Sequence, residues 1–305
     1  MDYGRPASPV RAAFFYSILV FLLVQVGGML GQFRLVGSVL TQVLILLGAP
    51  LFFAWYFDRR RMAELFRLRP LTLQGVVKSV LLGFLGWALA YVLGVVIFSL
   101  VTRAGGKLPQ VYQQLTSAPF LIALVTGAIV PSICEEMAFR GYLQFQLGPL
   151  GQRASVVVTA VLFGAMHLSL VRVVPLIVLG YLFATAVQRT GSILSGMIMH
   201  FVNNAVALGL TFFYRPEGGA QVDAPVLSTG ALLTAVLMLV GLAVIAIGLI
   251  RTFGPDDAVG RRVEPEATPA AVREGVGQVL LPLLPAVLIY AWAAGSEVVR
   301  VFAGR

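Results

Sequence analysis

A succession of apolar segments, each about 20 residues long, constrains the fold of this chain more than any other feature. Segments of this length cross a hydrocarbon core of about 30 Å as helices, and they are too long and too uniformly apolar for the strands of a membrane barrel. Only 11% of the 305 residues are charged and the mean hydropathy is +0.92, which excludes a water-soluble globular protein. We therefore expect an all-α polytopic membrane protein.

The apolar segments predict one transmembrane domain over residues 1–305, a bundle of eight or nine helices. The sixth segment is short and the ninth contains Pro282 and Pro285, so the number of spans is either eight or nine. Residues 252–277 are rich in charge, proline and glycine and are expected to form a flexible polar loop. The candidate spans are residues 12–31, 35–57, 76–101, 118–147, 154–171, 173–187, 192–212, 228–250 and 278–296.

The charge balance concerns topology and lipid contact. The 22 Lys and Arg outnumber the 13 Asp and Glu, and they lie beside apolar runs, where they set orientation and meet anionic headgroups, so nucleic acid is not an expected partner. With nine alternating spans and a cytoplasmic N-terminus, 14 basic residues fall on the inner side and 7 on the outer, Arg140 left aside. The positive-inside rule therefore favours a cytoplasmic N-terminus. Arginine predominance with abundant Ala, Gly and Val indicates a GC-rich prokaryotic genome, so the expected location is a prokaryotic plasma membrane.

Polar side chains inside the predicted spans gather in three patches. Ionisable groups in a bilayer are costly, so each is a candidate for function. The only intramembrane acids are expected to be Glu135 and Glu136, because the other acidic residues fall in loops or tails. The patches also hold both histidines and both asparagines of the chain; their members are Glu135, Glu136 and Arg140, then Phe163 and His167, then His200, Asn203 and Asn204.

Helical spacing separates the roles in the first patch. Glu136 and Arg140 are four residues apart, so they can pair within the helix and act as a structural clamp. Glu135 points about 100° away from them and has no partner in its own helix, which leaves it free for chemistry. Pro131 frees the carbonyl of Gly127 and is expected to kink the helix just before the two acids.

The other two patches bring histidines to the same depth. His200 and Asn204 are four residues apart and share a face, while Asn203 faces elsewhere. Phe163 lies one turn before His167 and is expected to wall its ring. Three helices thus predict one shared cavity within the membrane.

Such a cavity suits amide hydrolysis without a covalent intermediate. A desolvated glutamate can act as a general base on water, and a neighbouring histidine can orient that water and pass the proton to the leaving amine. An asparagine amide and a second imidazole N–H are donors suited to an oxyanion. Cys134 suggests a thiol nucleophile instead, but a lone buried cysteine is usually inert packing.

The three patches resemble the motif set of the CAAX-protease and bacteriocin-processing family of intramembrane glutamate endopeptidases. The pattern EExxxR is met by Glu135, Glu136 and Arg140, the pattern FxxxH by Phe163 and His167, and the pattern HxxxN by His200 and Asn204. The motifs in this order are specific, and the resemblance covers residues 118–212, the predicted catalytic core.

The resemblance implies a helical membrane fold whose conical cavity opens to the cytoplasm and to lipid. It implies Glu135 as the base assisted by His167, with His200 and Asn204 at the oxyanion and Glu136, Arg140 and Phe163 in support. The implied substrate is a membrane-associated protein or peptide, cleaved near its C-terminus and prenylated in CAAX-type cases. No cofactor and no metal are implied.

Two other classes stay open at this point. A zinc metalloprotease could use Glu, His and His as ligands, although the HExxH helix common in such enzymes is absent. A transporter or a scaffold could use the same cavity without proteolysis, although a transporter would be expected to show repeat symmetry. The sequence indicates neither the natural substrate nor the oligomeric state.

Overall fold

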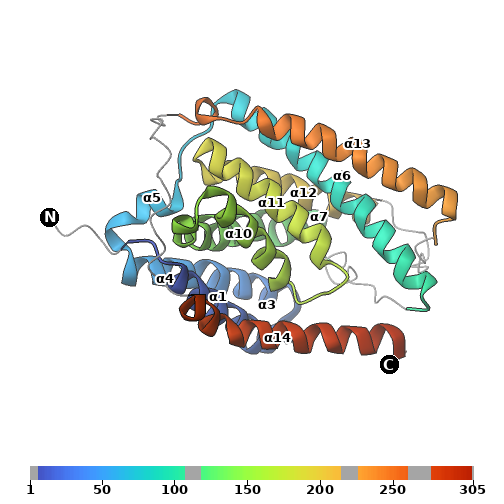
Figure 1. Ribbon diagram of the computed structural model, residues 1–305, viewed down its shortest axis with the longest axis horizontal. Coiled ribbons are helices and arrows are strands. Elements are labelled where there is room, and N and C mark those ends of the chain that lie inside the picture. Colours follow the sequence, from blue (N-terminus) through green and yellow to red (C-terminus); the bar gives the residue numbers. More distant parts are fainter. Residues whose placement is uncertain (1–5, 107–117, 214–225, 260–275, 304–305) are drawn as a thin grey trace.

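The computed structural model describes residues 6–106, 118–213, 226–259 and 276–303, and these residues form a helical bundle without a strand (Figure 1). Its long uninterrupted helices are apolar over most of their length, as the hydropathy pattern predicts. They are α6 (Leu73–Arg103), α11 (Val173–Thr190), α12 (Ile193–Phe213), α13 (Thr229–Arg251) and α14 (Val276–Ala303).

The first two predicted spans form a helical hairpin. Its chain direction reverses where Arg34 adopts the left-handed backbone angle φ of 51°. The two arms lie close together, because a Cβ added at Gly27 would be 3.2 Å from the Thr41 methyl group. The first arm contains α1 (Pro9–Leu22), the π-helical η1 (Leu23–Gly27), α2 (Gly28–Leu30) and the 3-10 turn η2 (Gly31–Phe33); the second contains α3 (Arg34–Leu40), the π-helical η3 (Thr41–Leu47) and α4 (Gly48–Phe57).

The fourth predicted span is a helix interrupted by two π-helical segments. Pro131 has no backbone N–H to donate to the carbonyl of Gly127, so the regular ladder breaks there, as expected. Residues 134–144 are continuously buried, which places this helix at the centre of the bundle. Its parts are α7 (Phe120–Leu124), η6 (Val125–Ile129), α8 (Val130–Glu136), η7 (Met137–Leu143) and α9 (Gln144–Gln146).

The fifth predicted span is shorter than expected. Helix α10 covers Gln152–Met166, or 15 residues, whereas the sequence predicts a span over 154–171. The sixth span, expected to be the short one, is α11 with 18 residues. The fifth span ends early because the chain turns after Met166. The sixth begins at Val173, as expected, and is longer because its helix continues to Thr190.

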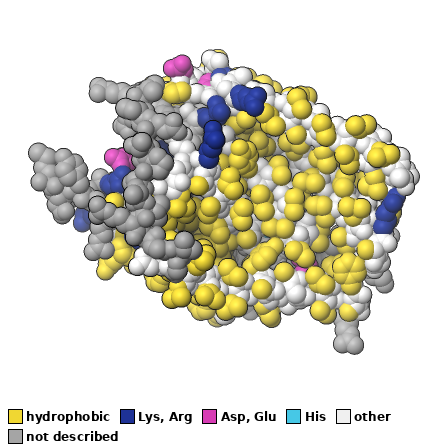
Figure 2. All heavy atoms as spheres, in the orientation of Figure 1, with side chains coloured by type: hydrophobic (Ala, Val, Ile, Leu, Met, Phe, Trp, Pro, Cys, Tyr) yellow, Lys and Arg dark blue, Asp and Glu magenta, His cyan; other side chains and the backbone are white. Residues whose placement is uncertain are grey.

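The protein is an integral membrane protein. Among the described residues, seven helices are long and apolar enough to cross a bilayer when the hairpin Pro9–Phe57 is taken as one, and no more than half of each most apolar stretch is buried inside the bundle. Figure 2 shows a face covered mostly by hydrophobic side chains, with Lys and Arg toward its ends. This surface matches a hydrocarbon environment bounded by headgroups.

Two buried apolar clusters hold the bundle together. One joins α1, η3, α4 and the central helix, and the other joins α6, α11, α12 and α13. Helix α12 lies between them and contacts both α6 and α8. Close approach of α6 to α12 depends on Gly83, where an added Cβ would come within 2.9 Å of Val202. Helix α13 packs on α6 and α14 packs on α1, so both lie at the periphery (Figure 1).

The segment after α13 is packed rather than loose at its start. Asp257 is 2% exposed and pairs with Lys78 of α6 at 2.9 Å. The backbone of Ala258 bridges to Leu71. The expected flexible loop over 252–277 is therefore wrong for residues 252–259, and residues 260–275 lie outside the described residues. Helix α14 begins at Val276 and runs through Pro282 and Pro285 to Ala303. The remaining short elements are η4 (Arg59–Arg61), α5 (Met62–Phe66), η8 (Gly148–Leu150) and η10 (Pro255–Asp257).

Candidate active site

Glu135 and Glu136 lie at the end of α8, between the π-helical segments η6 and η7. A π-helical turn inserts a residue into the helix and is frequent at functional sites. The two residues are 7% and 0% exposed, so both carboxyl groups depend on protein partners instead of bulk water.

Glu136 is neutralised by Arg140, as the spacing predicts. Their Oε1 and Nη1 atoms are 2.6 Å apart and both side chains are 0% exposed. The second guanidinium nitrogen donates to the carbonyl of Gly180 in α11 at 3.1 Å. The guanidinium also lies over the rings of Phe163 and Phe183, with its carbon 4.4 and 5.4 Å from the ring centroids. Arg140 therefore ties the central helix to α10 and α11.

His200 of α12 lies between the two glutamates. Its Nδ1 is 3.0 Å from Glu136 Oε1, and its Nε2 is 3.9 Å from Glu135 Oε2. A carboxylate paired with arginine can only accept, so Nδ1 carries the proton and donates it. Nε2 is then the nitrogen that faces Glu135. The ring stacks on Phe183 with centroids 5.4 Å apart, which fixes its plane.

His167 ends α10 instead of lying within it, which corrects the expectation that it is inside a span. Its Nδ1 donates to the carbonyl of Phe163 at 2.9 Å, since a backbone carbonyl can only accept. In the neutral ring this leaves Nε2 as a proton acceptor. His167 interacts electrostatically with Glu135 and His200. Phe163 packs edge-on against His167 with centroids 5.2 Å apart, as expected.

The turn after His167 is held by a carboxylate from α14. Leu168 adopts a left-handed backbone with φ of 50°. Ser169 Oγ donates to Glu297 Oε1 at 2.7 Å, and the N–H of Leu170 donates to the other carboxylate oxygen. Glu297 was expected to follow the last span as part of a tail, and it lies instead within α14. The C-terminal helix thus holds the turn that follows His167.

Asn204 caps the carbonyl that Pro131 leaves unpaired. Its Nδ2 donates to the carbonyl of Gly127 at 3.3 Å, so the expectation of a freed carbonyl is confirmed and its partner is identified. The amide of Asn203 donates to Asn204 Oδ1 at 2.9 Å. Asn203, expected to face elsewhere, therefore contacts Asn204.

Gln42 of η3 is the site residue that the sequence does not reveal. Its Nε2 donates to Glu135 Oε1 at 3.0 Å, so Glu135 has a partner outside its own helix. The only sequence signal is one amide in the middle of an apolar run, which is weaker than the signal of a charge. Among the described residues, Glu135 is thus contacted by one amide and faced by one imidazole.

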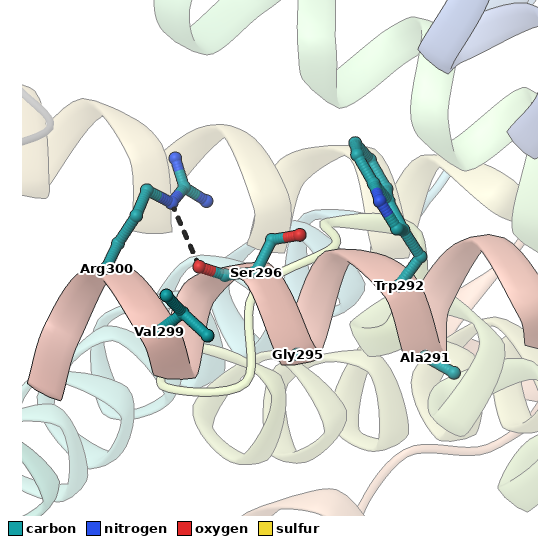
Figure 3. Close-up of a pocket in the computed structure, with 6 residues that line it drawn as sticks. All are labelled: Ala291, Trp292, Gly295, Ser296, Val299 and Arg300. Atoms are coloured by element: carbon teal, nitrogen blue, oxygen red, sulfur yellow. Dashed lines mark hydrogen bonds between the residues drawn. The ribbon is translucent and has the colours of Figure 1, made fainter. Parts of the chain in front are cut away.

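The remaining candidates contribute no reactive group to this arrangement. Cys134 is 2% exposed and belongs to the apolar cluster. In the described part of the chain, no three His, Cys, Asp or Glu residues are placed to hold a metal ion. Figure 3 shows a hollow on α14 that includes none of the site residues; it is lined by Ala291, Trp292, Gly295, Ser296, Val299 and Arg300.

Comparison with known proteins finds one family match. Residues 117–206 match the family model described as type II CAAX prenyl endopeptidase Rce1-like. The match shows that this segment is similar to the Rce1-like family. It contains the two glutamates, Arg140, both histidines and Asn204, so the resemblance inferred from the motifs is confirmed. No curated protein and no solved structure matches the chain. Gln42 and Glu297 lie outside the matched residues.

Gly196 tests how tightly the site is packed. A Cβ added there would lie 2.5 Å from Glu136 Oε2 and 2.9 Å from Val187, and the Arg140 contact prevents Glu136 from yielding. We expect Gly196→Ala to lower the stability of the protein by about 1–3 kcal/mol through overpacking, measured as a lower Tm in detergent. Gly209→Ala, in the same helix with open space around it, is the control and is expected to leave Tm unchanged. Equal Tm values for the two variants would contradict the close contact.

Proposed function

We propose that this protein is an intramembrane endopeptidase in which Glu135 activates water to hydrolyse a peptide bond. The observation that carries the proposal is the convergence of Glu135, Glu136 and His200 inside a membrane bundle, in the segment that matches the Rce1-like family. Polar groups placed at such cost inside a bilayer are typical of a functional site.

Glu135 is better suited to the role of base than Glu136. Glu136 is occupied by Arg140 and His200, and a carboxylate held by a cation is a weak base. Glu135 has no cationic side chain at ion-pair distance among the described residues other than His200, whose Nε2 is 3.9 Å away. That separation is too long for a direct hydrogen bond, and one water oxygen can bond both atoms across it.

The chemical step follows from these positions. The water oxygen attacks the scissile carbonyl carbon while its proton passes to Glu135. The developing oxyanion is stabilised by Asn204, whose amide has a second N–H besides the one given to Gly127, and by His200 when its Nε2 is protonated. His167 then accepts this proton from Glu135 through Nε2 and delivers it to the leaving amine as the C–N bond breaks.

The substrate proposed is a membrane-associated protein or peptide cleaved near its C-terminus, including prenylated CAAX-type sequences. The support is the printed description of the matched family and the membrane placement of the site. A site buried among membrane helices is accessible to a substrate that is itself anchored at the bilayer.

The central test is the hydrolysis of a fluorogenic prenylated CAAX peptide by the full-length protein in detergent. We expect Glu135→Gln, His167→Ala and His200→Ala each to abolish cleavage while the protein stays folded, because each removes a proton-transfer or water-orienting group. Glu64→Gln, which changes an exposed carboxylate away from the site, is the control and should cleave normally. Cleavage by Glu135→Gln at the wild-type rate would refute the proposal, and loss of wild-type cleavage with a zinc chelator would favour a metalloenzyme.

Asn204 is expected to be less critical than the proton-transfer groups. Asn204→Ala should lower kcat about 10²–10³-fold, the effect of losing one oxyanion donor. Asn203→Ala removes only a hydrogen bond to the Asn204 side chain and should cost clearly less. Single-turnover rates with the same peptide measure both effects. A larger loss of kcat for Asn203→Ala than for Asn204→Ala would show that Asn204 is not the oxyanion donor.

We further propose that the N-terminus is cytoplasmic, in a prokaryotic plasma membrane, as the distribution of basic residues indicates. Gln32, at the turn of the hairpin, and Glu64, after α4, then lie on opposite sides of the bilayer. In a Cys134→Ser background, Gln32→Cys should react with an impermeant maleimide on intact cells, and Glu64→Cys only after permeabilisation. The reverse pattern would invert the proposed topology.

A further inference from the structure

The N-terminal hairpin supplies a direct partner to the proposed base. Gln42 lies 93 residues before Glu135 along the chain, outside the family-matched residues 117–206. Its Nε2 donates to Glu135 Oε1 at 3.0 Å, which leaves Glu135 Oε2 as the atom that faces His200. The two oxygens of one carboxylate therefore have different surroundings.

The local backbone is built to bring Gln42 to this position. Gln42 belongs to the π-helical η3, and η3 packs directly against α8. A π-helical turn shifts the register of the side chains that follow it, so its presence in both η3 and the central helix re-aims residues at their contact. The neighbouring Thr41 uses its hydroxyl within its own helix, donating to the carbonyl of Gly37 at 2.8 Å.

The amide of Gln42 is only half satisfied. Its Oε1 is buried and has no hydrogen-bond partner among the described residues. A buried acceptor without a donor is costly, and in a bilayer there is no bulk water to supply one. Packing alone would be served at lower cost by an apolar residue of the same length, such as methionine.

We infer that Gln42 is a positioning residue for Glu135. Its N–H holds Oε1, so that the carboxylate turns Oε2 toward the attacking water and His200. This inference rests on the proposed function, and it assigns to the hairpin a part in the reaction that the motif-bearing segment does not supply.

The test compares three variants of the full-length protein in detergent with the same prenylated peptide. Gln42→Met keeps length and removes both hydrogen-bonding atoms, and Gln42→Glu keeps shape and replaces the donor with an acceptor. Thr41→Val is the matched control in the same turn. We expect both Gln42 variants to lower kcat about 10–100-fold with KM within about twofold, and Thr41→Val to leave both constants unchanged.

A stability measurement makes the test independent of turnover. If Gln42 and Glu135 are coupled, the loss in Tm of Gln42→Met combined with Glu135→Gln is smaller than the sum of the two single losses. Additive losses, or wild-type kcat for both Gln42 variants, would overturn the inference. If Glu135→Gln cleaves normally, the proposed function fails instead; if Glu135→Gln is inactive while the Gln42 variants keep full kcat, only the role of Gln42 is lost.

Discussion

The buried pair of Glu136 and Arg140 is the interaction on which the rest of the site depends. Both side chains are fully removed from solvent, so each charge is tolerable only because the other lies 2.6 Å away. Leaving one partner alone would cost about 3–5 kcal/mol, which gives the pair a single strongly preferred arrangement. Through Gly180 and His200 the pair also fixes α11 and α12 to the central helix. It therefore determines which nitrogen of His200 faces Glu135.

Adjacent glutamates acquire opposite properties because a helix rotates about 100° between them. The Glu136 side chain lies in a cluster with a guanidinium, an imidazole and two aromatic rings, and its charge is neutralised by Arg140. The other accepts a hydrogen bond from a neutral amide, lies 3.9 Å from the far nitrogen of the same imidazole and interacts electrostatically with His167. Of the two adjacent carboxylates, one is thus held in an ion pair with Arg140, and the other has no arginine or lysine partner among the described residues.

The spans and the three motif patches could be predicted from the sequence because the bilayer penalises polar groups so strongly that each exception is visible. The Glu136–Arg140 contact follows from helical spacing alone, and Pro131 exposes the carbonyl that Asn204 binds. Gln42 could not be found in this way, since one neutral amide carries a much smaller penalty than a charge. The end of α10 at Met166 and the contact of Glu297 depend on how distant helices pack, which one sequence does not encode in any local pattern.

The flanking helices complete the site for a reason that follows from the solvent. In water, Oε1 of Glu135 and the backbone N–H of Leu170 could both be hydrated. In a bilayer, each needs a partner from the protein. Gln42 from the hairpin and Glu297 from α14 are those partners, and both lie outside the family-matched segment. The segment 117–206 thus holds both glutamates and both histidines, while the hydrogen bond to Glu135 Oε1 comes from Gln42, 93 residues away along the chain. In the proposed mechanism, a change at Gln42 therefore alters catalysis without touching any motif residue.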